Sequence, residues 1–201
     1  MAVRRQFLTG GAVAAASVWV APSVVRLDRA AAASGSGQCE TPNVFGGAQY
    51  TTAPTITRPG GPLEDFISFV WNEHGPCELT QDLVVNRVTA GSFTGGSNEN
   101  QVIPQGTCVC SFFVHGDRLD DDGLLTGTMT FGSTTILGLI YRTAELLASD
   151  ELETPGTSYT YGAMEPGDTM DLDLTPGANS FSWEMLFGTG LDQVRVITSC
   201  P

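Results

Sequence analysis

The chain has 201 residues, of which 41% are hydrophobic and 15% are charged, and its 22 acidic side chains outnumber 9 basic ones, which gives a formal net charge of −13. This apolar content excludes a disordered chain, and 24 glycines and 11 prolines exclude a long coiled coil. A chain this acidic does not follow a phosphate backbone, so we expect no nucleic-acid partner.

The first 33 residues have the composition of a bacterial export signal. A pair of arginines is followed by an apolar run over residues 9–25, which glycine and alanine dilute, and small residues then form a cleavage site. Paired arginines shortly before Phe and Leu are typical of the twin-arginine signature, a receptor-read export address. We therefore predict a twin-arginine signal peptide over 1–33, carried by Arg4, Arg5, Phe7 and Leu8 and cleaved between Ala33 and Ser34.

Cleavage would make the mature protein more acidic and free it from the membrane. It would remove four arginines and one aspartate, so the formal charge would change from −13 to −16. The twin-arginine machinery is then the expected export partner, the protein is periplasmic or extracellular, and no stable membrane anchor remains. An uncleaved anchor is the alternative, because an apolar run of about 17 residues is near the lower limit for a membrane span.

Beyond the signal, alternation of apolar and polar residues predicts antiparallel strands with one face on a core and the other in water. Clusters of Gly, Pro, Asn and Asp separate the strands, and only residues 143–149 have helical character. We therefore predict an all-β fold, an antiparallel, jelly-roll-like β-sandwich with one short helix. Residues 34–62 are expected to form an N-terminal arm with the first strand or strands, and 63–201 the core of the domain. In chain order the expected strands are 66–71, 83–89, 106–115, 124–131, 134–141, 169–174, 180–187 and 192–199.

Several blocks of this region occur in an order that is similar to a known family. They are GT at 106–107, SFFVHGD at 111–117, GTMTF at 127–131, ILGLI at 136–140, LASD at 147–150, PGTSY at 155–159 and DQVRVIT at 192–198. The chain resembles a family of exported bacterial β-sandwich domains, often found in proteins with a PEP-CTERM sorting tail, whose biochemical role is not established. The resemblance implies the fold and a location outside the cytoplasm, and it supplies no catalytic residues. This chain differs from the family in lacking a sorting tail and in its cysteines.

Five cysteines follow the predicted signal, and export into an oxidising compartment favours disulfides. Cys108 and Cys110 share one strand face at a spacing of about 7 Å, so they should not bond each other. We prefer a bridge from Cys39 to Cys200 and a second from Cys77 to either Cys108 or Cys110. In a protein that folds before export, such bridges reinforce a core that must stand alone.

A metal is the alternative use of some of these cysteines. His74, Cys77, Cys108 and Cys110 could supply one imidazole and three thiols, which is the ligand set of a tetrahedral zinc site. The spacing of these residues is not that of a strong zinc motif, so disulfides remain the preferred interpretation.

Asp117, Asp120 and Asp122 lie in the densest acidic stretch, on an expected hairpin turn that ends at Gly123. Carboxylate oxygens on such a turn suit calcium, so no cofactor is certain and Ca²⁺ is a candidate. Arg118 occupies a ligand position of a complete calcium loop, and a solvated hairpin tip is the alternative.

Aromatic side chains suggest a surface for sugars. Tyr159 and Tyr161 have like parity in a loop rich in Gly, Pro and Thr, so we expect an exposed pair that stacks on a sugar ring. Trp183 alternates with core residues, and we expect it in the core. His115 could act as a general base, but with His74 as the only other histidine the chain has little acid–base material.

These features favour an exported, non-catalytic β-sandwich module that binds or structures extracellular material. Polysaccharide or cell-envelope material is the expected partner, with calcium as a candidate aid. One alternative is a secreted glycan hydrolase that uses paired carboxylates, and the other is a metal-loaded protein that uses the histidine and cysteine set. No nucleophile elbow, metalloprotease helix or phosphate-binding loop occurs, so a binding module is preferred over an enzyme.

Overall fold

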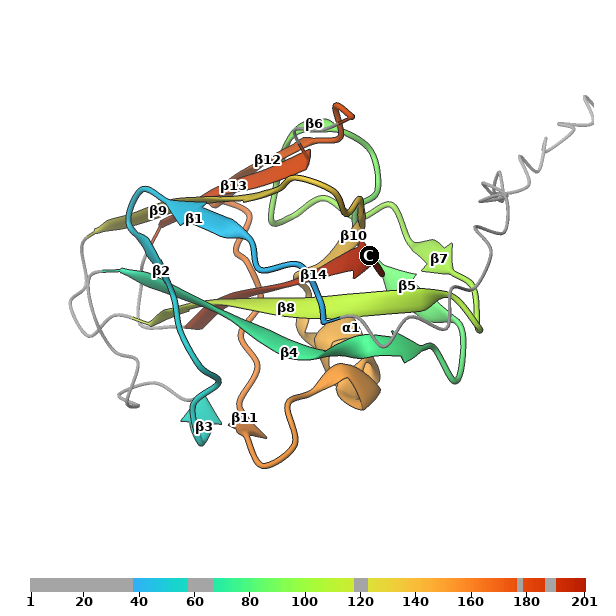
Figure 1. The fold of residues 1–201 in the computed structure, drawn as a ribbon. Coiled ribbons are helices and arrows are strands. Elements are labelled where there is room, and N and C mark those ends of the chain that lie inside the picture. Colours follow the sequence, from blue (N-terminus) through green and yellow to red (C-terminus); the bar gives the residue numbers. More distant parts are fainter. Residues whose placement is uncertain (1–37, 58–66, 118–122, 177–178, 187–190) are drawn as a thin grey trace, which may run out of the picture. The chain divides into compact units, whose positions relative to one another are not determined.

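A computed structural model describes residues 38–57, 67–117, 123–176, 179–186 and 191–201, which form two five-stranded sheets packed face to face (Figure 1). The first sheet is antiparallel, in the order β1 (Asn43–Phe45), β9 (Leu124–Phe131), β13 (Asn179–Leu186), β12 (Thr169–Asp173) and β6 (Gly91–Thr94). The second has the order β10 (Ile136–Ile140), β14 (Leu191–Ser199), β8 (Cys108–Asp117), β4 (Ser68–Glu78) and β2 (Ala48–Tyr50), with β2 parallel to β4. The predicted fold class, an antiparallel β-sandwich with one short helix, is confirmed.

Smaller elements surround the sandwich. Strand β3 (Ile56–Thr57) pairs in parallel with β11 (Ser158–Tyr159), and β5 (Leu83–Val85) pairs with β7 (Gln101–Ile103). The helix α1 (Thr143–Ala148) lies where the sequence predicts helical character, at 143–149, and a 3₁₀ turn, η1 (Asp150–Leu152), follows it. Within the described ranges, no helix has the length and apolar character needed to span a membrane.

The core between the two sheets contains the inward residues of the alternating strands. Trp183 is 1% exposed, as expected, and its indole N–H donates to Ser68 Oγ of the opposite sheet at 2.9 Å. Gly127 on β9 faces the Trp183 ring, and a Cβ at this position would lie 2.2 Å from it. This close approach explains why a residue without a side chain holds an inward position of β9.

Strands β8 and β14 are buried on both faces, so the expectation that every strand turns one face to water is wrong for them. Phe112 lies in the core between the sheets, whereas its neighbour Phe113 lies in a second core on the outer face. Leu146 of α1 and Leu152 of η1 cover this outer face, together with residues of β5 and β7. Both parities of β8 carry apolar residues, and each set is covered by its own layer.

The N-terminal arm is held to the sandwich by a carboxylate and a disulfide. Glu40 accepts hydrogen bonds from the backbone N–H groups of Gly132 (2.6 Å), Ser133 (3.1 Å) and Thr134 (2.8 Å), in the turn between β9 and β10. Partial burial raises the pKa of the Glu40 carboxyl, but these hydrogen bonds outweigh burial and lower the pKa to about 2. The neighbouring Cys39 is disulfide-bonded to β8, so the arm is fixed before β1 and β2 join the two sheets.

Candidate functional site

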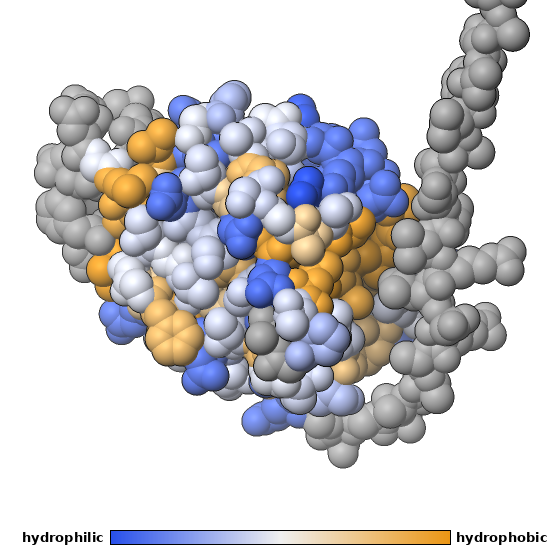
Figure 2. All heavy atoms as spheres, turned by 90° about the horizontal axis from the view of Figure 1, so that it is seen from above, coloured by the Kyte–Doolittle hydropathy of each residue, from blue (hydrophilic) through white to orange (hydrophobic). Residues whose placement is uncertain are grey.

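A shallow groove of about 310 Å³ crosses the outer face of the first sheet. Figure 2 views the molecule from this side, and pale and blue residues of low hydropathy predominate over these strands. Along the groove the strands alternate, so that apolar residues enter the core and their polar neighbours lie on this face. The paired Leu124 and Leu186, which are 48% and 51% exposed, are apolar exceptions at the ends of β9 and β13. The polar lining of the groove is formed by Ser92, Thr126, Thr128, Thr169, Asp171, Ser182 and Glu184.

Side chains on adjacent strands are hydrogen-bonded across the groove. A serine donates to an aspartate between β6 and β12, two hydroxyls pair between β9 and β13, and a threonine donates to a glutamate between β12 and β13. These contacts orient hydroxyl and carboxylate oxygens side by side, with no basic residue among the residues that line the groove. The three pairs are Ser92–Asp171 at 2.8 Å, Thr128–Ser182 at 2.9 Å and Thr169–Glu184 at 3.1 Å.

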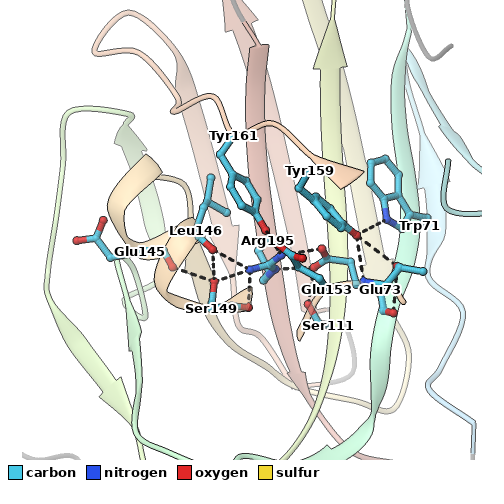
Figure 3. Close-up of polar contacts among 11 residues, drawn as sticks. Trp71, Glu73, Ser111, Glu145, Leu146, Ser149, Glu153, Tyr159, Tyr161 and Arg195 are labelled. Atoms are coloured by element: carbon cyan, nitrogen blue, oxygen red, sulfur yellow. Dashed lines mark hydrogen bonds and ion pairs between the residues drawn. The ribbon is translucent and has the colours of Figure 1, made fainter. Parts of the chain in front are cut away.

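Tyr159 and Tyr161, expected as an exposed pair, are half-buried instead. Their rings stack on each other with centroids 5.5 Å apart, and both lie against Phe113 of the outer core. The Tyr159 hydroxyl accepts from the Trp71 indole at 3.4 Å, and the Tyr161 hydroxyl donates to Glu153 (Figure 3). Packing within the fold thus uses both rings, and the groove on the first sheet is the better candidate for a ligand.

A buried ion pair lies beside the tyrosines (Figure 3). Arg195 of β14 contacts Glu73 of β4 through Nε–Oε2 at 2.6 Å and Nη2–Oε1 at 2.8 Å, and both side chains are 0% exposed. Arg195 also donates to the carbonyl of Ser149 at 2.9 Å and to that of Leu146 at 3.2 Å, at the end of α1. Burial by itself lowers the pKa of Arg195, but Glu73 outweighs it and raises that pKa. The pair therefore fixes the helix to the sheet.

The disulfides connect different cysteines from those we prefer on sequence alone. Cys39 is bonded to Cys110 and Cys108 to Cys200, while Cys77 forms no disulfide. The predicted Cys39–Cys200 and Cys77 pairings are therefore wrong. The expectation that Cys108 and Cys110 do not bond each other is confirmed, because both reach from one face of β8 toward a different end of the chain.

The zinc hypothesis is wrong for the same reason. It requires Cys108 and Cys110 as thiolates beside His74 and Cys77, but both are consumed in disulfides. In the part of the chain that the structure describes, no group of three or more metal-ligating side chains is gathered in one place.

Most residues of the predicted calcium turn and of the predicted signal peptide lie outside the described residues. Asp117 ends β8 and is 2% exposed, whereas Asp120 and Asp122 lie outside the described residues, so the calcium turn stays a prediction. The signal residues Arg4, Arg5, Phe7 and Leu8 and the cleavage residues Ala33 and Ser34 also lie outside them.

His115 is a buried structural residue. Its Nδ1 lies 2.9 Å from Gln193 Nε2, and Gln193 also donates to the Thr160 carbonyl at 3.1 Å. Burial lowers the pKa of His115 to about 4, so the imidazole is neutral at neutral pH. This position, closed from solvent, does not suit a general base.

Two buried aspartates form a feature that sequence reasoning missed. Asp168 is 0% exposed and accepts from the backbone N–H groups of Leu186 and Glu165. Asp192 is 4% exposed, and its carboxylate has no hydrogen bond or ion pair among the described residues. Burial, with the negative charges of Asp168 and Glu165, raises the pKa of Asp192 to about 8. The signal in the sequence was an aspartate at the strand parity of Val194 and Val196, which are apolar.

No protein-family model, curated protein or solved structure matches this chain. The resemblance to exported β-sandwich domains thus stays a prediction. Function has to be inferred from the groove and from the charges of the fold itself.

Proposed function

We propose that the domain is a non-catalytic module that binds neutral polysaccharide in the groove of the first sheet. The observation that carries this proposal is the row of hydroxyl and carboxylate oxygens, paired across four strands and without a basic residue among the groove's lining residues. Sugar hydroxyls both donate and accept hydrogen bonds, so they suit a surface of this kind. The acidic lining disfavours ligands that carry carboxylate or sulfate groups.

Removing one hydroxyl pair from the groove should weaken polysaccharide binding. We expect the double variant T128A/S182A to bind a neutral glucan or xylan about tenfold more weakly, because each lost hydrogen bond costs about 0.5–1.5 kcal/mol. Affinity electrophoresis in gels that contain the polysaccharide measures the change.

The matched control is T130A/S180A, which removes the next hydroxyl pair on the same two strands, outside the groove. This variant should bind like the unchanged protein. Equal weakening by both double variants, or no binding to any neutral polysaccharide in a glycan array, would contradict the proposal.

The same experiment tests the hydrolase alternative. Asp171 and Glu184 are the two carboxylates in the groove, on the neighbouring strands β12 and β13. If the protein releases reducing sugar from polysaccharide and E184Q or D171N abolishes that release, the protein is a glycan hydrolase and not a binding module.

We also propose that the protein reaches its ligand by twin-arginine export. Its two disulfides are consistent with an oxidising, non-cytoplasmic compartment. The exported protein should begin at Ser34 on N-terminal sequencing, and replacing Arg4 and Arg5 by lysine should retain the precursor in the cell. An exported chain that still contains Arg4 would contradict the cleaved signal.

A further inference from the structure

The buried aspartates Asp168 and Asp192 belong to opposite layers of the sandwich. Asp192 of β14 has the parity of Val194, which lies in the core between the sheets. Asp168 stands two residues before Met170 of β12, which lies in the same core. Both carboxylates are therefore directed from their sheets toward the space between the layers.

One segment of chain joins the two aspartates. It begins at Gly162, whose N–H donates to Gln193 at 2.9 Å and which packs so closely on Leu191 that a Cβ would lie 1.9 Å from the Leu191 carbonyl oxygen. It ends at Asp168, whose carboxylate accepts the Glu165 N–H. The segment 162–168 thus runs from the start of β14 to the start of β12 and places the two carboxylates at the same end of the sandwich.

The negative charge at this end has no counterion among the described residues. The Asp168 carboxylate accepts hydrogen bonds from two backbone N–H groups, but the Asp192 carboxylate accepts none from the described residues. Neither carboxylate forms an ion pair with a described residue. Glu165 adds a third negative charge that acts on Asp192. A carboxylate on a side chain that is only 4% exposed and receives no donor from the described part of the chain is costly, so a proton, a water molecule or a cation has to relieve it.

We propose that Asp168 and Asp192 bind a calcium ion between the two sheets. Calcium is coordinated by about six to eight carboxylate, main-chain carbonyl and water oxygens in flexible geometry, so carbonyls and waters would have to complete the shell that the two aspartates begin. With two carboxylates the affinity should be that of extracellular calcium modules, with a Kd of about 10⁻⁴–10⁻³ M. Asp117 of β8 is the register partner of Leu191, one position from Asp192, but it has the opposite strand parity to Gly116, the partner of Asp192. The proposal does not depend on polysaccharide binding.

Calcium should raise the thermal midpoint of the disulfide-bonded protein. At a calcium concentration of about ten times Kd, and against NaCl of equal ionic strength, we expect a rise of about 3–6 °C at pH 9. The rise should be smaller at pH 6, because a proton then occupies Asp192. Calorimetric titration should give a stoichiometry of one ion at this site.

The variant D192N distinguishes this site from others. It should fold, because the amide removes a buried charge without changing volume, and it should lose the calcium-dependent rise. D173N is the matched control, because it removes a half-buried acid at the other end of β12 that accepts hydrogen bonds from Thr175, and it should keep the rise. The proposal is overturned if calcium does not raise the thermal midpoint at pH 9. It is also overturned if calcium raises the midpoint equally in D192N and the unchanged protein, because the ion then binds elsewhere.

Discussion

Replacing Glu73 by alanine should lower the free energy of unfolding by about 3–5 kcal/mol, because it leaves the guanidinium of Arg195 buried without its counterion. Both side chains are 0% exposed, and Arg195 is additionally bonded to the end of α1. The variant should therefore lose the packing of α1 on the outer core as well. Urea denaturation followed by fluorescence and far-UV circular dichroism measures the change.

The chain contains a second Arg–Glu pair that serves as the control. Arg87 and Glu99 lie 2.9 Å apart, with side chains 15% and 22% exposed. E99A should cost only about 1 kcal/mol, because solvent screens a partly exposed pair and hydrates the remaining arginine. Similar losses in E73A and E99A would show that burial does not set the contribution of the Glu73–Arg195 pair.

Breaking either disulfide should have the second large effect. The bridges close segments with sequence separations of 92 residues for Cys108–Cys200 and 71 for Cys39–Cys110. In the chain-entropy description, each contributes about 4 kcal/mol, which corresponds to a fall of about 8–16 °C in the thermal midpoint. Differential scanning calorimetry of C200S and C39S measures these losses.

Cys77→Ser is the matched control, because Cys77 forms no disulfide and its loss should change the midpoint little. A fall for this variant as large as for C200S would instead support pairing through Cys77. Under the proposed twin-arginine export, the core forms before its bridges, so reductant should lower the midpoint of the unchanged protein while leaving it folded at room temperature. Unfolding by reductant alone would contradict folding before export.

Local sequence features were sufficient to predict most strands. The alternation in residues 169–174 and 180–187 predicted β12 and β13 to within a residue or two, because pleated strands direct successive side chains to opposite faces. The same alternation predicted Trp183 in the core, and thereby the polar face that holds the groove.

The same reasoning did not reveal which faces would be covered. It assigned one side of β8 to water, yet Phe113 and Val109 on that side lie in a second core under α1 and η1. It also treated Tyr159 and Tyr161 as exposed, because the polar loop around them gave no sign that they stack on each other and pack against Phe113. Burial here depends on segments far apart in sequence.

By itself, the sequence determined the β-sandwich class, the short helix, the strong acidity and the presence of disulfides, because residue period, turn chemistry and composition act over a few residues. Only the tertiary structure decided which cysteines pair, that Glu73 meets Arg195 across 122 positions, and that Asp168 and Asp192 share one end of the core. These contacts depend on strand order and on packing of the two layers, which alternation within a single strand does not encode. The groove combines both levels, since alternation supplies its hydroxyl and carboxylate residues and strand order brings them side by side.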